Sequence, residues 1–134
     1  MPRLVRRLAA AAFLFLCGAL AQRAWSNSSY QVLKYLDTPL EGDPKREVRM
    51  QSVTFPPGSG NGFHRHPGAQ WALVQEGEVT LTIQGQPPRT LKAGESVYLP
   101  RGTIHKNQNL SDKPARSVEV SILDINQRPA ESVE

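Results

Sequence analysis

The sequence predicts an all-β domain, a sandwich or barrel of short strands, and three observations support this. Strand-length segments rich in β-branched and aromatic residues recur along the chain. Turn-forming residues, mainly glycine and proline, separate them at the spacing typical of a sandwich or barrel. After the first 21 residues no window of about a dozen residues keeps a helical period, and the 11 prolines interrupt the segments that would otherwise be candidate helices.

Six segments are predicted to be strands, each for its own reason. The first is rich in Tyr, Val and Leu, and the second alternates, with Arg49, Gln51 and Val53 on one face. The third and fourth flank a hairpin turn at Gly77, the fifth lies between Gly94 and Pro100, and the sixth is rich in Val and Ile. In chain order they are YQVLKYL (30–36), REVRMQSVTF (46–55), WALVQ (71–75), VTLTIQG (79–85), SVYLP (96–100) and RSVEVSILDI (116–125).

The first 21 residues have the layout of a secretory signal peptide. Three arginines precede an uncharged apolar run, and the run ends in the small-x-small sequence Ala19-Leu20-Ala21. The run is shorter than the roughly 20 residues that span a bilayer. We therefore expect cleavage near Ala21 and a secreted or periplasmic protein, with an uncleaved membrane anchor as the alternative. Residues 22–29 are expected to be a flexible lead, 30–126 the β domain and 127–134 a frayed tail.

Charge and cysteine content exclude several classes of function. Three of the 16 Lys and Arg residues lie in the signal peptide, which leaves 13 basic against 12 acidic residues in the rest of the chain. This scattered, near-neutral charge predicts binding neither to nucleic acid nor to an anionic membrane. Because the single cysteine, Cys17, also lies in the signal peptide, disulfides and thiolate chemistry are not expected in the mature protein.

The stretch GFHRHPGAQW (62–71) is a candidate metal site. A β-strand repeats its side-chain direction every two residues, so His64 and His66 are expected on one face, where two imidazoles can chelate an ion. The alternative is a polar strand face with no ligand. Pro100 and Gly102 can turn the chain so that His105 meets the first pair, and these are all three histidines of the sequence.

The residues around these histidines resemble the two motifs of the cupin family. The first motif is a glycine, H-x-H, a glutamate and a second glycine at fixed spacings, and the chain departs from it only by carrying Gln70 in place of the glutamate. The second motif is matched throughout. The matching residues are Gly58, His64, His66 and Gly77 in the first, and Gly94, Pro100, Gly102, His105 and Asn109 in the second.

The resemblance implies a double-stranded β-helix, also called a jelly-roll or cupin barrel, of the small single-domain type 2 that is similar to quercetin dioxygenases. It also implies one divalent metal ion, Fe, Mn, Ni, Zn or Cu, held by His64, His66, Gln70 and His105. An amide offers only a neutral carbonyl oxygen, so Gln70 is expected to bind more weakly than a glutamate. The alternative is that Gln70 makes this a metal-free pocket.

Neighbouring residues are given provisional roles. Phe63, Trp71 and Tyr98 are expected to line a substrate pocket, with ordinary core packing or a dimer face as the alternative. Asn109 is expected to cap a turn, Arg65 is expected to point away from the site, and no carboxylate base is evident beside the histidines.

Two classes of function remain open at this point. The first is an exported, metal-dependent, dioxygenase-like oxidoreductase, or a related enzyme, that acts on a small organic molecule. The second is a non-catalytic module that binds a small molecule or a metal, and a purely structural jelly roll is a third, simpler possibility. The sparse charge on WALVQ and VTLTI predicts an apolar outer face and hence a homodimer.

Overall fold

The computed structural model describes residues 29–134. The predicted signal peptide and all but the last residue of the predicted lead lie outside this range. Within it, every regular element is a β-strand, which confirms the all-β prediction. No helix in this part of the chain is long and apolar enough to cross a membrane.

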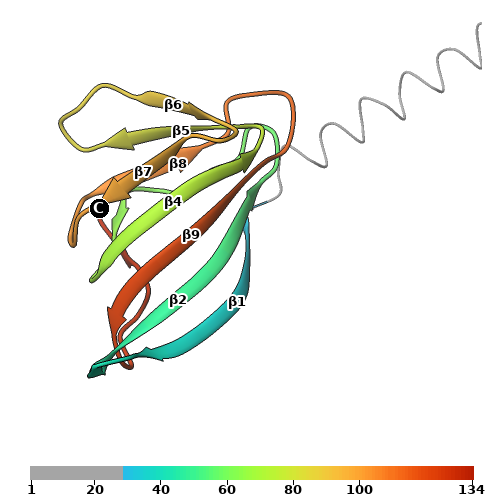
Figure 1. The fold of residues 1–134 in the computed structure, drawn as a ribbon. Helices are drawn as coiled ribbons and strands as arrows, with labels where there is room; N and C mark the ends of the chain where they lie inside the picture. Colours follow the sequence, from blue (N-terminus) through green and yellow to red (C-terminus); the bar gives the residue numbers. More distant parts are fainter. Residues whose placement is uncertain (1–28) are drawn as a thin grey trace, which may run out of the picture.

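The strands form two antiparallel five-stranded sheets that face each other as a jelly roll (Figure 1). The first sheet has the order β1-β2-β9-β4-β7 and the second has the order β10-β3-β8-β5-β6. The strands are β1 (Gln31–Leu40), β2 (Asp43–Phe55), β3 (His64–Arg65), β4 (Ala69–Glu76), β5 (Glu78–Ile83), β6 (Arg89–Lys92), β7 (Ser96–Leu99), β8 (His105–Gln108), β9 (Ala115–Asp124) and β10 (Glu131–Ser132).

All six predicted strands form, as β1, β2, β4, β5, β7 and β9, and four short strands were not predicted. Those four, β3, β6, β8 and β10, contain two to four residues each. Such segments are too short to show a period of two, so their pairing partners define them rather than their own sequence. Two of them, β3 and β8, carry His64 and His105.

An apolar core lies between the two sheets. It consists of Val53, Phe55, Val74, Val79, Leu81, Leu91, Leu99 and Ala115, drawn from both sheets. On β2, Arg49 and Gln51 share the inner face of Val53 and line a pocket next to this core. The core therefore supports one end of the pocket, and the two sheets supply its walls.

Strand β9 presents its polar face to the interior, against the usual pattern. The buried positions include Ser117, Glu119 and Ser121, while Val118 and Val120 are only half-buried on the outer face. Ordinary hydrophobic patterning would place the valines inside. The inverted pattern puts polar side chains into the pocket and apolar ones on the outer surface.

The expectation of a frayed tail at residues 127–134 is wrong. Strand β10 pairs with β3, with Ser132 opposite His64, and the Val133 N–H donates to the Phe63 carbonyl at 2.9 Å. The exposed Arg65 and Glu131 side chains also form an ion pair at 2.9 Å. Because β3 is otherwise paired only with β8, the C-terminal residues complete its backbone hydrogen bonding.

Asn109 holds the loop before β9, as its predicted capping role requires. Its fully buried Nδ2 donates to the carbonyls of Phe55, at 2.9 Å, and Lys113, at 2.7 Å, and its Oδ1 accepts from the Ser111 N–H at 3.0 Å. These bonds link the end of β2 to the loop that leads into β9.

We expect Asn109→Ala to destabilise the protein strongly. Each buried backbone group left without a partner costs about 1–3 kcal/mol, and this substitution orphans the carbonyl of Phe55. Denaturant unfolding monitored by fluorescence measures the loss. Asn107→Ala is the matched control. The backbone N–H of residue 107 donates to Asn61 Oδ1, and this hydrogen bond does not depend on the side chain that is removed. Equal midpoints for the two variants would contradict the capping role.

Candidate metal centre

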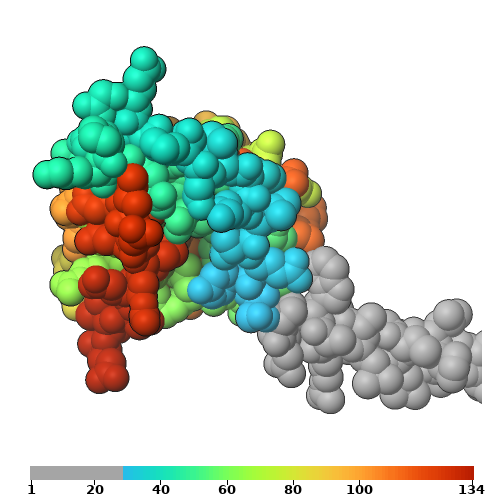
Figure 2. Space-filling view, turned by 90° about the horizontal axis from the view of Figure 1, so that it is seen from below, coloured from blue at the N-terminus to red at the C-terminus, as the bar shows by residue number. Residues whose placement is uncertain are grey.

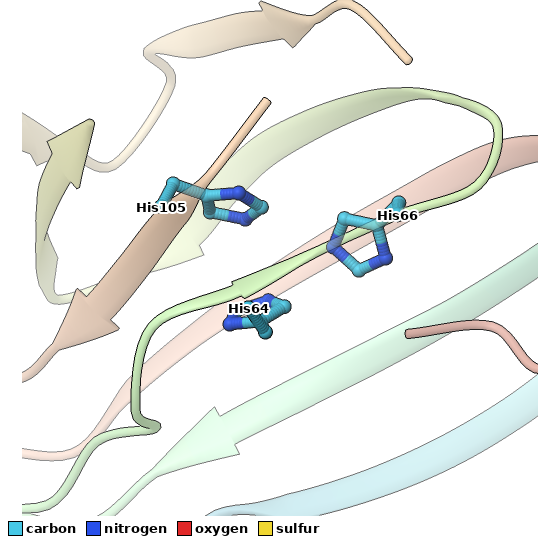
Figure 3. A group of neighbouring side chains, drawn as sticks. All are labelled: His64, His66 and His105. Atoms are coloured by element: carbon cyan, nitrogen blue, oxygen red, sulfur yellow. The ribbon is translucent and has the colours of Figure 1, made fainter. Parts of the chain in front are cut away.

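The three histidines converge from two strands of one sheet (Figure 3). His64 in β3 lies directly opposite His105 in β8, and His66 follows the end of β3 by one residue. The ring centroids are 4.3 Å apart for His64 and His105, 5.0 Å for His64 and His66, and 5.2 Å for His66 and His105. One nitrogen from each ring lies within 4.8 Å of the other two, so the three residues could hold one metal ion.

Each ring is held by a backbone carbonyl at its Nδ1 atom. His64 donates to Gly62 at 2.9 Å, His66 to Pro129 at 2.7 Å, and His105 to Thr103 at 3.0 Å. A carbonyl can only accept, so Nδ1 carries the proton and the lone pair of a neutral ring lies on Nε2. This is how metal-binding histidines are oriented in proteins.

The Nε2 atom of His105 is buried and has no hydrogen-bond partner among the described residues. A buried polar atom without a partner is costly and therefore rare in a folded protein. A metal ion bound among the three rings would give this lone pair a partner. The donor set of three neutral imidazoles also suits a borderline divalent cation, so these residues fit the metal that the cupin motifs imply.

Burial lowers the pKa of each of the three histidines below the usual value of 6.5, and brings that of His105 to about 4. Desolvation is the main cause, since it disfavours the charged ring. Hydrogen bonds to the backbone oppose it, and repulsion from neighbouring rings adds to the lowering for His64 and His105. The three rings are thus neutral at pH 7, so their Nε2 lone pairs are available to bind a cation.

We expect the metal-free protein to lose stability as the pH falls from 6.5 toward 4. The unfolded chain binds protons at its histidines near pH 6.5, before the folded chain does, so acid favours unfolding by up to about 1.4 kcal/mol per pH unit for each histidine. Burial raises the pKa of Glu119, so the folded chain takes up this proton before the unfolded chain does. Glu119 therefore adds stability as the pH falls, and this gain is complete below pH 4.5. With three histidines against one glutamate, the net loss remains.

Urea unfolding at pH 7, 6 and 5 in the presence of a chelator measures this dependence. A free energy of unfolding that stays level across this range would contradict the neutral state of the rings.

The opposite wall of the pocket, on the first sheet, carries Gln70 and a carboxylate that sequence reasoning missed. Gln70 in β4 is 2% exposed, and Glu119 in β9 is 6% exposed. The Oε2 atom of Glu119 accepts from Gln70 Nε2 at 3.1 Å and from Gln51 Nε2 at 3.0 Å. The expectation that no carboxylate accompanies the histidines is therefore wrong. The Ser-x-Glu-x-Ser alternation on a strand otherwise rich in Val and Ile was the signal that could have revealed it.

The pocket between these walls has a volume of about 480 Å³ and contains His64, His66 and Gln70 in its lining. Of the three aromatic residues expected there, only Phe63 lines it. Trp71 and Tyr98 do not; they are 44% and 51% exposed and pack against each other, with ring centroids 5.1 Å apart. They occupy alternate strand positions to the buried Gln70 and Leu99, and therefore point to the outer face.

Part of the pocket wall is formed by the two ends of the described chain. Tyr30 and Val32 line it from the N-terminal side, and Pro129, Ala130, Ser132 and Val133 line it from the C-terminal side. Figure 2 shows the N-terminal strand in blue and C-terminal residues in red on the same face of the molecule. The C-terminal segment therefore both holds His66 and encloses the pocket.

We expect deletion of residues 128–134 to weaken metal binding by roughly 10- to 100-fold, the usual effect of losing an outer hydrogen-bond partner. The deletion removes the Pro129 carbonyl that orients His66 and the strand that pairs with β3. Competition with a chromogenic chelator measures the affinity. The matched control is Glu131→Gln, which removes the exposed ion pair with Arg65 but keeps the backbone. Unchanged affinity after the deletion would contradict this role.

Together, the jelly roll and the three-histidine cluster define a small β-barrel protein with a candidate metal site inside. The sequence profile of the cupin domain matches residues 51–121, which is more than half of the chain, and so the chain belongs to the cupin family.

Two curated relatives have different activities. The chain is 38% identical over 71 residues to the HTH-type transcriptional regulator PuuR of Escherichia coli K12. This alignment covers 52% of this chain and 38% of that protein. It is 34% identical over 79 residues to oxalate oxidase GF-2.8 of Triticum aestivum, with 53% of this chain and 35% of that protein covered. The chain thus spans little more than a third of the length of these relatives.

Among solved structures, a cupin-like protein (tm1010) from Thermotoga maritima superimposes with a TM-score of 0.64 at 28% identity. The match covers 78% of this chain and 75% of the other. The shared fold extends well beyond the segment that the sequence comparisons align.

Proposed function

We propose that this protein is an exported metal-binding cupin that acts as a dioxygenase-like oxidoreductase on a small organic molecule. The observation that carries the proposal is the convergence of three imidazoles that bind backbone carbonyls through Nδ1, with the buried Nε2 atom of His105 left without a partner among residues 29–134. The proposed metal is one divalent ion, Fe, Mn, Ni, Zn or Cu, held by His64, His66, His105 and Gln70. Similarity to an oxalate oxidase supports an oxidative reaction.

The residues of the chain give this site its chemical character. A bound divalent ion would act as a Lewis acid toward oxygen atoms of a substrate. Three protein imidazoles leave coordination positions open, as in catalytic rather than structural sites. Phe63 and Val53 make part of the pocket wall apolar, and this favours a small organic ligand over a fully hydrated one.

Metal analysis followed by an oxygen-uptake assay tests the proposal. The mature protein should carry close to one equivalent of a transition metal by elemental analysis. After loading with ferrous iron, it should consume oxygen with catechol-like or diketone substrates. Protein that takes up no metal would refute the metal-based function, whereas metal binding without turnover would favour a binding module.

A non-catalytic binding module is the second candidate function, and similarity to a transcriptional regulator favours it. In this case the pocket would hold a small molecule without converting it. Calorimetric titration of candidate ligands into the metal-loaded protein separates the two functions, because a module would release its ligand chemically unchanged.

The proposed location is outside the cytoplasm, on the basis of residues 1–21. Protein recovered from the periplasm or medium of its own host should begin near Gln22 when its N-terminus is sequenced. Recovery from the cytoplasm with Met1 retained would refute export.

The proposed assembly is a homodimer formed through the outer face of the first sheet. The register aligns an uncharged row across all five strands of that sheet: Leu36, Met50, Val120, Trp71 and Tyr98. A second copy would offer the same apolar row to a two-fold interface. On the second sheet, by contrast, Thr80 alternates with the core residues Val79 and Leu81 on β5.

Sedimentation equilibrium at micromolar concentration tests this assembly. The wild-type protein should have the mass of a dimer, and Trp71→Lys should shift it to the monomer. A wild-type monomer would refute the dimer.

A further inference from the structure

The buried carboxylate of Glu119 accepts hydrogen bonds from three strands of the first sheet. Gln51 of β2 and Gln70 of β4 donate to Oε2 at 3.0 and 3.1 Å, and Ser117 of β9 itself approaches Oε1 at 3.4 Å. Every partner donates and none accepts, which is the environment of a carboxylate acting as an acceptor. Hydrogen bonds of this kind are among the strongest in proteins when the carboxylate is charged.

The bond to Glu119 fixes how Gln70 can act. An amide has one donor end and one acceptor end, and the Nε2 end of Gln70 is committed to the carboxylate. If the amide turned over, two oxygen acceptors would face each other at hydrogen-bond distance, which is unfavourable. The Oε1 atom is therefore the only polar atom of this side chain that remains available to bind a cation in the pocket.

Glu119 lies close to Gln70 in the first sheet. Ser121 lies directly opposite Gln70 in the β4–β9 pairing, and Glu119 is two residues away on the same inner face. Glu119 is thus a diagonal neighbour of Gln70, on the adjoining strand. Gln70, Glu119, His64 and His66 all line one pocket.

We propose that Glu119 is the displaced carboxylate of the metal centre: it holds Gln70 with Oε1 free for the ion and supplies the negative charge that the motif glutamate would carry. Glu119 is a positioning residue here, because it acts through Gln70. This inference rests on the proposed metal-binding function. A purely structural role would be to tie β2, β4 and β9 together, and the experiment must distinguish the two.

The experiment measures affinity for Mn²⁺ and Ni²⁺ in four proteins: the wild type, Glu119→Gln, the exchange variant Gln70→Glu with Glu119→Gln, and the control Glu47→Gln. The exchange variant keeps one carboxylate and one amide in hydrogen-bond contact but moves the charge to position 70. Glu47 is a half-buried carboxylate on β2, paired with Arg49, and does not line the pocket. Free Mn²⁺ is measured by electron paramagnetic resonance, and Ni²⁺ by competition with a chelator.

We expect Glu119→Gln to lower Mn²⁺ affinity by roughly 10- to 100-fold. The loss for Ni²⁺ should be smaller, because nickel relies on imidazole whereas manganese depends on oxygen ligands and charge. The exchange variant should recover wild-type Mn²⁺ affinity or exceed it, and Glu47→Gln should leave both affinities unchanged. A loss in folded Glu119→Gln that is larger for Mn²⁺ than for Ni²⁺ is the result that a merely structural role would not produce, because a loosened pocket would weaken binding of both ions alike.

The outcomes separate the two proposals. If the wild-type protein binds neither ion, the proposed metal function fails and this inference fails with it. If the wild type binds metal but Glu119→Gln binds Mn²⁺ equally well, only the role of Glu119 is refuted. Should Glu119→Gln fail to fold, the folded exchange variant decides: Mn²⁺ affinity well below wild type would refute the inference, and affinity at or above wild type would support it.

Discussion

Replacing His105 by asparagine is expected to abolish stoichiometric binding of a divalent metal. The substitution removes one of three imidazoles and the only one whose Nε2 is buried without a partner in the described chain. Loss of a direct ligand should exceed the roughly 100-fold effect of losing an outer hydrogen-bond partner. Elemental analysis after dialysis against one equivalent of Zn²⁺ measures the result.

Arg65→Lys is the matched control for this experiment. Arg65 lies between two of the histidines in sequence, but its side chain is 52% exposed and pairs with Glu131 on the surface. It should retain a full equivalent of metal. Circular dichroism must show that both variants are folded, and a folded His105→Asn protein with one equivalent of bound metal would disprove the proposed centre.

Gly68→Ala is expected to prevent stable folding. A Cβ atom at this position would lie 1.8 Å from the Ile122 carbonyl oxygen and 2.8 Å from its carbon, far inside any permitted contact. Neither atom belongs to a flexible side chain, so β4 and β9 would have to separate where Ala69 pairs with Ile122. We expect a loss on the order of 4 kcal/mol, at the upper end for single substitutions.

Gly62→Ala provides the control, because a Cβ atom there has no neighbour within 4 Å. Thermal unfolding of both variants measures the difference. A melting temperature for Gly68→Ala close to that of Gly62→Ala would show that the two strands can shift apart without cost. The same packing brings Gln70 beside Glu119, so a partly folded Gly68→Ala protein should also bind Mn²⁺ more weakly.

Much of the fold could be predicted because its signals are local. The strands β5 and β9 are rich in β-branched and apolar residues, and glycines lie at the turns. The motif glycines Gly58, Gly77, Gly94 and Gly102 all adopt positive φ, as turns of this kind require. The short strands β3, β8 and β10 have no such local signal and exist only because distant segments pair with them.

The inner face of β9 could not be predicted from hydrophobicity. Its valines suggest that Val118 and Val120 face inward, but the interior at that level is a polar pocket and not the apolar core. The choice of face depends on register with β2 and β4, which places Gln51 and Gln70 beside Glu119. The same register turns Trp71 and Tyr98 outward, against expectation.

The sequence by itself determined the class of fold and the three histidines, because strand-length patterning and the spacing around His64, His66 and His105 are written in consecutive residues. Only the tertiary structure decided which further groups join them. Glu119 comes from a strand more than 50 positions away from His64, and the Pro129 carbonyl reaches His66 from the last turn of the chain. Such contacts depend on the register of β9 with β4 and on the pairing of β10 with β3. Neither can be predicted from a pattern of consecutive residues.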